Sequence, residues 1–188
     1  MSLPDPPGPP GLIETERLSL RPLRAADAGP MALYAGDRRV AEMLEQVPHP
    51  YPPGAAEAYI ERIAAGRGDE RVWAMDATRI DGPEFIGVVS LRPDREADGA
   101  WRLGYWVGPP FWNTGYASEA AAGIVGAARR AGIGRLDARI LKANEASAHV
   151  LLNAGFVETG EGETFSVAQD AMTPCRLFSF DPTGGGGA

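Results

Sequence analysis

The chain has 188 residues, enough for one domain with a sizeable core, and its hydrophobic content of 44% is ordinary for a folded protein. Its formal net charge of −7, from 18 basic and 25 acidic residues, argues against a nucleic-acid-binding surface. No run approaches the roughly 20 apolar residues needed to cross a bilayer, so no membrane partner is expected.

The two ends of the chain differ in composition from its centre. The first ten residues contain five prolines and no apolar stretch like that of a signal peptide, and residues 184–187 are all glycine. We therefore expect a flexible Pro-rich lead-in over residues 1–11, one domain over 12–182 and a disordered Gly-rich tail over 183–188. A cytoplasmic location is the corresponding expectation.

The first half of the chain predicts a strand, three short helices and three further strands. Residues 17–23 alternate polar and apolar side chains, as a half-buried strand does. Four prolines between positions 48 and 53 break the chain before the third helix, and turn residues at 81–83 and 98–99 separate the later strands. The predicted helices cover residues 28–35, 37–44 and 55–65, and the predicted strands 17–23, 71–77, 84–92 and 100–107.

The second half predicts helices alternating with strands. In the first helix apolar residues recur at i, i+3, i+4 and i+7, and Gly132 is a natural residue to end it. Asn144 can cap the second helix, and Gly155 ends it. The predicted helices are 118–131 and 145–153, and the predicted β segments are 135–141, 156–159, 164–168 and 175–180, with a hairpin-like loop at 169–174.

This order of elements predicts a mixed α/β (α+β) domain with a central sheet of about six or seven strands. The first half of the sheet is expected to be antiparallel, because its strands follow one another through short turns. The helix over 118–131 joins the strand at 100–107 to the strand at 135–141. A right-handed crossover of this kind makes those two strands parallel neighbours.

The segment from Gly104 to Ala120 points most directly to a ligand. An aromatic strand passes through a turn containing Gly115 and continues into an Ala-rich helix. The first N–H groups of a helix lack intrahelical acceptors and lie at the positive end of its dipole, so several donors can hold one phosphate there. An ordinary strand-to-helix turn is the alternative, because one short glycine motif is a weak signal.

Four stretches together carry a resemblance to a known family. Residues 112–117 (WNTGYA) fit a phosphate loop of the form Gln/Arg-x-x-Gly-x-Gly/Ala, and Asn144-x-x-Ser147 is followed by Gly155-Phe156. Residues 13–22 (IETERLSLRP) and 103–107 (LGYWV) add a first and a fourth strand of familiar sequence. The chain thereby resembles the GNAT superfamily of acyl-CoA N-acyltransferases, particularly its RimJ/RimL-like branch of ribosomal-protein N-terminal acetyltransferases.

The resemblance implies a GNAT-like fold and acetyl-CoA as the cosubstrate. Backbone amides around residues 113–118 would hold the pyrophosphate, and a strand edge would pair with the pantetheine arm. Asn144 would hold the same arm, beside or instead of capping its helix. The implied cofactor-binding residues are Trp106, Val107, Trp112, Asn113, Thr114, Gly115, Tyr116, Ala117, Ser118 and Asn144, of which Trp106 and Val107 belong to the strand edge.

The chain departs from the family pattern at four positions. Trp112 stands where many members have Gln or Arg, and Asn113 replaces a common Gly, which predicts altered geometry in the first half of the loop. Leu151 occupies the position of a Tyr that serves other branches as general acid, and Arg102 a strand position that is often acidic. The sequence therefore identifies neither the acid nor the base.

Acyl transfer to an amine requires a neutral amine, stabilisation of an oxyanion and a proton for the departing thiolate. The implied catalytic residues are Val107, whose backbone N–H would polarise the thioester carbonyl, and Ser147, whose hydroxyl would supply the proton. A purely structural role in its helix is the alternative for Ser147. Direct attack without an acyl-enzyme is expected, and four carboxylates are conceivable bases with no preference among them: Glu14, Glu84, Glu119 and Glu158.

The predicted function is acetyl transfer from acetyl-CoA to a primary amine, either a small molecule or a peptide N-terminus. A catalytically idle acyl-CoA-binding or sensing module is the alternative, motivated by Leu151 and the lack of an evident base. No metal is expected, because Cys175 is the single cysteine and His49 and His149 lack metal-ligand spacing. The sequence leaves monomer and homodimer open.

Overall fold

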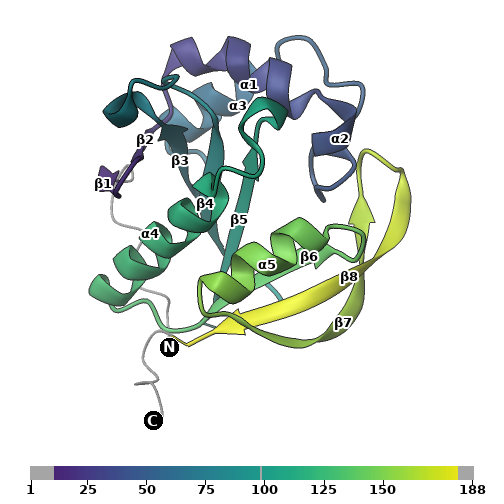
Figure 1. Ribbon diagram of the computed structural model, residues 1–188. Helices are drawn as coiled ribbons and strands as arrows, with labels where there is room; N and C mark the ends of the chain where they lie inside the picture. Colours follow the sequence, from purple (N-terminus) through teal and green to yellow (C-terminus); the bar gives the residue numbers. More distant parts are fainter. Residues whose placement is uncertain (1–10, 98, 182–188) are drawn as a thin grey trace.

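A mixed sheet and five helices make up the part of the chain that the computed structural model describes, residues 11–97 and 99–181 (Figure 1). The strands are β1 (Ile13–Glu14), β2 (Ser19–Pro22), β3 (Arg71–Asp76), β4 (Gly87–Pro93), β5 (Trp101–Val107), β6 (Leu136–Leu141), β7 (Val157–Ser166) and β8 (Ala171–Phe180). The helices are α1 (Ala28–Ala35), α2 (Arg38–Ala41), α3 (Ala55–Ala64), α4 (Tyr116–Arg130) and α5 (Glu145–Asn153). Except for Gly11, the expected lead-in and tail lie outside the described residues.

The eight strands follow the order β1-β2-β3-β4-β5-β6-β8-β7. The pair β5 and β6 is parallel, as the crossover through α4 predicts, and the other neighbouring pairs are antiparallel. The predicted fold class is therefore confirmed. The predicted strand count of six or seven is slightly low, because the two-residue strand β1 pairs separately with β2.

Two hydrophobic clusters lie on opposite faces of the sheet. Along β3, Trp73 and Met75 belong to the cluster that α4 and α5 cover, whereas Val72 and Ala74 belong to the cluster that α1 and α3 cover. Successive side chains of a strand point to opposite faces, so one strand supplies both cores. The result is three layers, with the sheet between two pairs of helices (Figure 1).

The helices begin and end close to the predicted residues. Both α1 and α5 have the predicted bounds, and α4 begins two residues earlier than predicted, at Tyr116. Helix α2 ends at Ala41 rather than at residue 44. The difference has a backbone cause, because the N–H groups of Met43 and Leu44 bond three residues back instead of four, which tightens the chain into turns.

The C-terminal β segments form one long hairpin. The predicted segments 156–159 and 164–168 are the two ends of β7, which runs through a register shift between Glu158 and Gly160. The predicted loop at 169–174 is shorter, since β8 already begins at Ala171. Pro174 suggested a loop, but it lies within β8 opposite Glu163 and just past the end of β6, where its carbonyl accepts from the Lys142 N–H and its missing N–H costs only the reciprocal bond of that pair.

The parallel pair β5 and β6 is short. It covers three residue pairs, from Trp101 opposite Leu136 to Leu103 opposite Ala138. Beyond this point the two strands diverge, which Figure 1 shows as an opening between the upper part of β5 and β6. The divergence leaves one edge of β5 unpaired over its last four residues.

Candidate active site

The opening between β5 and β6 gives access to backbone groups that no strand pairs. The N–H of Trp101 donates toward β6 and the N–H of Gly108 donates toward β4. Backbone polar groups alternate between the two edges of a strand, so the odd-numbered residues of β5 turn to the β6 side. The last residue of β5 that pairs with β6 is Leu103. The N–H and C=O groups of Tyr105 and Val107, which lie farther along β5, therefore face the opening.

Trp112 fixes one of these backbone groups. Its indole N–H donates to the carbonyl of Val107 at 2.7 Å, while the N–H of Val107 stays directed at the opening. By the same alternation Trp106 turns its backbone to β4, where it lies opposite Val88. The expected strand edge is therefore revised: Tyr105 and Val107 present their backbone to the opening, whereas Trp106 contributes its side chain.

Two cavities meet at this opening. The larger, which we call the α4 cavity, has a volume of about 820 Å³ and is lined by α2, the turn into α4 and the start of α5. The smaller, the α3 cavity, has a volume of about 440 Å³ and is lined by α1, α3, the loop after α2 and strands β4 to β6. Six residues line both cavities: Met43, Leu44, Tyr105, Trp106, Asn144 and Ser147.

The start of α4 forms one wall of the α4 cavity. Gly115 is the N-cap with φ of +83°, and Asn113 has φ of +60°, so the chain turns twice through the left-handed region. The first helical bond runs from the Glu119 N–H to the Gly115 carbonyl, which leaves the N–H groups of residues 116–118 without a partner in the helix. Most of the predicted loop residues line this cavity (Trp112, Asn113, Gly115, Tyr116, Ala117 and Ser118), and Thr114 does not.

Glu119 anchors the helix start to the N-terminal segment. Its carboxylate accepts hydrogen bonds from the Thr15 hydroxyl at 2.5 Å, the Arg17 backbone N–H at 2.6 Å and Arg17 Nε at 2.7 Å. Arg17 also donates to the Thr114 carbonyl and lies over the Tyr116 ring. Burial alone would raise the pKa of Glu119, but these hydrogen bonds lower it overall. Glu119 is thus an anionic anchor.

Asn144 and Ser147 lie at the start of α5, where the two cavities join. Asn144 Oδ1 accepts from the Ser147 N–H at 3.1 Å, so the predicted cap is confirmed. The Ser147 carbonyl accepts from the Tyr105 hydroxyl at 2.9 Å, and its own hydroxyl has no hydrogen-bond partner among the described residues. Burial raises the pKa of Tyr105, which keeps its hydroxyl protonated. Leu151 is fully buried in the core behind this site.

The four carboxylates considered as bases, Glu14, Glu84, Glu119 and Glu158, line neither cavity. Glu14 pairs with Arg79 and Glu158 pairs with Arg176. The carboxylates that do line the α3 cavity are Glu45 and Glu70, which sequence reasoning missed. No local signal points to them, because Glu45 lies in a loop and Glu70 just before β3, and only the packing of these segments brings them to the cavity.

Cys175 is buried, and burial raises the pKa of its thiol, so it is no candidate nucleophile. Within residues 11–97 and 99–181 no cluster of three or more His, Cys, Asp or Glu side chains is placed to hold a metal ion. No helix formed by these same residues combines the length and the apolar character needed to cross a membrane.

Comparison with known proteins agrees with this geometry. The family model of the acetyltransferase (GNAT) domain matches residues 17–157. The chain therefore belongs to the GNAT acetyltransferase family. YoaA of Bacillus subtilis (strain 168), itself an uncharacterized N-acetyltransferase, is 28% identical over 155 residues, which cover 79% of this chain and 84% of YoaA.

Solved structures share the fold at low sequence identity. A GNAT-family acetyltransferase from Bacillus anthracis superposes with a TM-score of 0.78 at 16% identity, covering 92% of this chain and 99% of that one. RimL, a ribosomal L7/L12 α-N-protein acetyltransferase in complex with coenzyme A, gives a TM-score of 0.73 at 16% identity, covering 91% and 98%. RimJ and two ribosomal-protein acetyltransferases are also among the structural neighbours, so the predicted resemblance is confirmed.

Proposed function

We propose that this chain transfers an acetyl group from acetyl-CoA to a primary amine. The observation that carries the proposal is the meeting of two cavities at Tyr105 and Trp106, next to Val107, which lines the α4 cavity and whose backbone N–H has no partner among the described residues. The α4 cavity offers three helix-start N–H groups for a pyrophosphate and an unpaired strand edge for the amides of a pantetheine arm. The α3 cavity reaches Tyr105 and Trp106 from the other face of the sheet, which suits the acceptor amine.

In this proposal Val107 stabilises the negative charge of the reaction. Its N–H donates to the thioester carbonyl, and the bond strengthens as the carbonyl oxygen becomes an oxyanion. The amine nitrogen forms a bond to the carbonyl carbon, and the carbon–sulfur bond then breaks. No acyl-enzyme is needed, because the acceptor reaches the thioester directly through the α3 cavity.

Two protons must move during the transfer. We assign the proton for the departing thiolate to the Ser147 hydroxyl, which lines both cavities and is free to rotate. A thiol has a pKa near about 8.5, so its thiolate leaves readily and a weak donor suffices. An ammonium acceptor first releases one proton to water in the α3 cavity and attacks as the neutral amine. After attack the nitrogen loses a second proton, which passes through water to Ser147 and restores its hydroxyl. Tyr105 stays protonated and holds the Ser147 carbonyl.

A catalytically idle acyl-CoA-binding module is the second candidate, because Leu151 is buried where other branches carry a catalytic Tyr. The two are separated by measuring thiol release from acetyl-CoA against N-terminal peptides, polyamines and small amines, with CoA binding measured in parallel. We expect both binding and turnover. Tight CoA binding without turnover on any amine would favour the idle module over the enzyme.

Gly115 provides the test of the CoA site. We expect Gly115→Glu to weaken CoA binding about tenfold or more, because it adds a negative charge to the turn that would hold the pyrophosphate. Its Cβ, 3.2 Å from Arg17 Nη2, also lets that carboxylate neutralise Arg17 beside the turn. Gly115→Ala has the same backbone strain at φ of +83° without the charge and should bind far better. Gly29→Glu adds the same charge at an exposed site where a Cβ meets nothing within 4 Å, and should bind CoA normally. Equal affinity in all three variants would contradict the assignment.

Acceptor size, location and assembly are proposals as well. A peptide N-terminus and a small amine both suit the open α3 cavity, and the panel above distinguishes them. We keep the cytoplasm as the proposed location. Sedimentation of the purified chain decides between monomer and homodimer.

A further inference from the structure

The floor of the α3 cavity is a row of arginines on three neighbouring strands. Arg92 on β4 lies directly opposite Arg102 on β5, so their side chains share one face of the sheet. Arg139 on β6 follows Ala138, the last residue paired with β5, and its side chain is on the same face. All three line the α3 cavity. The row crosses the sheet where β5 and β6 begin to diverge.

The charge that faces the cavity is positive. One carboxylate, Glu45, lines the cavity together with the three arginines, while Asp94 and Glu96, which pair with Arg102 and Arg139, do not line it. On the opposite wall Arg62 and Glu70 bind each other. The carboxylates that neutralise the arginine row therefore lie mainly outside the cavity. A ligand inside the cavity meets the guanidinium groups.

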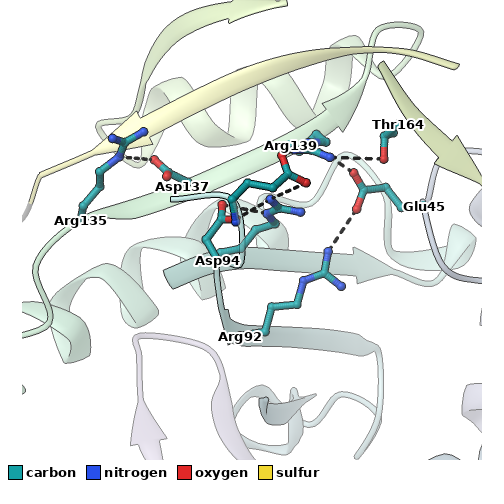
Figure 2. Close-up of polar contacts among 9 residues, drawn as sticks. Glu45, Arg92, Asp94, Arg135, Asp137, Arg139 and Thr164 are labelled. Atoms are coloured by element: carbon teal, nitrogen blue, oxygen red, sulfur yellow. Dashed lines mark hydrogen bonds and ion pairs between the residues drawn. The ribbon is translucent and has the colours of Figure 1, made fainter. Parts of the chain in front are cut away.

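Glu45 accepts hydrogen bonds from only part of this arginine row. Its Oε2 accepts from Arg92 Nη2 at 3.1 Å, as Figure 2 shows, with Glu45 lying between Arg92 and Arg139. Its Oε1 is buried and lies 3.8 Å from Arg139 Nε, and neither atom has a hydrogen-bond partner among the described residues. A buried polar atom without a hydrogen-bond partner is costly even where the rest of its group is paired. Asp94 and Glu96 bind other donors of Arg102 and Arg139, and Arg139 Nε remains without an acceptor.

From this arrangement we infer that the acceptor carries a carboxylate, which binds to the arginine row while its amine reaches Val107. The inference rests on the proposed acetyl transfer. Arginine suits a carboxylate because its planar N–H donors can bind both oxygens at once. Arg92 is the most exposed side chain of the row, at 27% against 13% for Arg102 and Arg139, so it is the first that a bound carboxylate would meet.

The strand geometry sets the distance between the two groups of the acceptor. Val107 is five residues from Arg102 along β5. Arg139 on β6 is level with Gly104 of β5, which is three residues from Val107. At about 3.4 Å per residue these separations are roughly 17 and 10 Å. Because the arginine side chains shorten the span, the amine and the carboxylate should be about 10 Å apart. An extended peptide of about three residues has this length.

Glycine oligomers and their C-terminal amides test the inference in the unaltered chain. The oligomers of two to five residues differ in length alone, and each amide lacks only the carboxylate. At about 10 Å the carboxylate has little influence on the pKa of the amine in water. We expect kcat/KM for triglycine to exceed that for triglycinamide about ten- to a hundredfold, as charge-assisted hydrogen bonds predict. The ratio should be smaller for diglycine and diglycinamide, whose two ends are too close together to reach both the row and Val107; glycine itself is left out of this comparison because its adjacent carboxylate raises the pKa of its amine.

Two variants connect the preference to the row. In Arg139→Gln and Arg92→Gln the ratio of acid to amide should fall toward one, while CoA affinity and the unfolding midpoint stay measurable as checks of folding. Arg95→Gln is the control, because Arg95 is strongly exposed and does not line the cavity; it should keep the ratio. If Arg139→Gln does not fold, Arg92→Gln and the unaltered chain still decide the matter.

The outcomes separate this inference from the proposed function. Equal turnover of acids and amides at every length, or faster turnover of polyamines than of triglycine, would overturn the carboxylate site and leave the acetyltransferase intact. A preference for acids that survives in both row variants would also overturn it. Binding of CoA with no turnover on any amine would instead refute the proposed reaction.

Discussion

Gly87 controls the position of the strand end that carries Val107. It opens β4 and lies directly opposite Val107. A Cβ added at Gly87 would lie 2.3 Å from the Trp106 carbonyl oxygen and 2.9 Å from the Cα of Val107. Both are backbone atoms of β5, so no side chain can rotate away. In Gly87→Ala the two strands must therefore move apart.

The size of this movement gives the expected effect. Since a Cβ essentially never approaches another heavy atom within 3.0 Å, the Trp106 oxygen must retreat by about 0.7 Å. A misplacement of about 1 Å in a reacting geometry costs about a hundredfold in rate, so we expect kcat/KM to fall roughly 30- to 100-fold. Overpacking of this kind also costs about 1–3 kcal/mol in the free energy of unfolding.

Thiol release from acetyl-CoA measures the rate, and urea unfolding measures the stability. Gly126→Ala is the matched control, because a Cβ there approaches only the end of the Arg130 side chain, at 3.4 Å. It should leave kcat/KM unchanged and stabilise α4 by about 0.5–1 kcal/mol. If Gly87→Ala folds and keeps kcat/KM within twofold of the unaltered chain, the placement of Val107 is not what limits the reaction.

Three further outcomes follow from the structure. Trp112→Phe removes the N–H that holds the Val107 carbonyl, so the KM for acetyl-CoA should rise about three- to tenfold in steady-state kinetics while folding is preserved; an unchanged KM would remove this role from Trp112. Arg21→Met leaves Asp27 and Asp76 buried without their cation and should cost about 3–5 kcal/mol in urea unfolding; a loss below 1 kcal/mol would contradict this. Burial would raise the pKa of Asp76, but its hydrogen bonds lower the pKa overall in the folded protein. The ionised Asp76 carboxylate therefore contributes to stability above its unfolded pKa of about 3.9, and this contribution is lost as the pH falls through its lower pKa in the folded protein. Asp76→Asn should therefore flatten the pH dependence of stability below about pH 4, whereas parallel curves for the two proteins would argue against it.

Local chemistry accounts for the elements that the sequence predicted well. Helix α5 has its predicted bounds because Asn144 caps it and Gly155, at φ of +91°, ends it. The start of α4 was placed two residues late, because apolar periodicity marks the buried face of a helix and does not locate its first turn. The phosphate-loop motif coincides with the start of α4, since its glycine, Gly115, is the residue that permits the left-handed turn before the helix.

Other features arise only when distant segments meet. The three predicted segments 156–159, 164–168 and 175–180 form one hairpin, because pairing with β8 carries β7 through Gly160 and pairing with β7 keeps Pro174 within β8. Glu45 reaches the arginine row because its carbonyl accepts from the Val167 N–H, which holds the loop after α2 against the hairpin. Neither contact has a local pattern in the sequence.

The sequence by itself determined the order of the elements, the crossover that makes β5 and β6 parallel, and the left-handed turn at Gly115 before α4, because caps, turns and periodicity act within a few residues. The tertiary structure decided where β5 parts from β6, which backbone groups of β5 face the opening, and which side chains share the α3 cavity. These depend on strand register and on the packing of segments up to a hundred residues apart, and no local pattern encodes such distances. The catalytic backbone N–H of the proposal is therefore invisible in the sequence, since every residue but proline carries one.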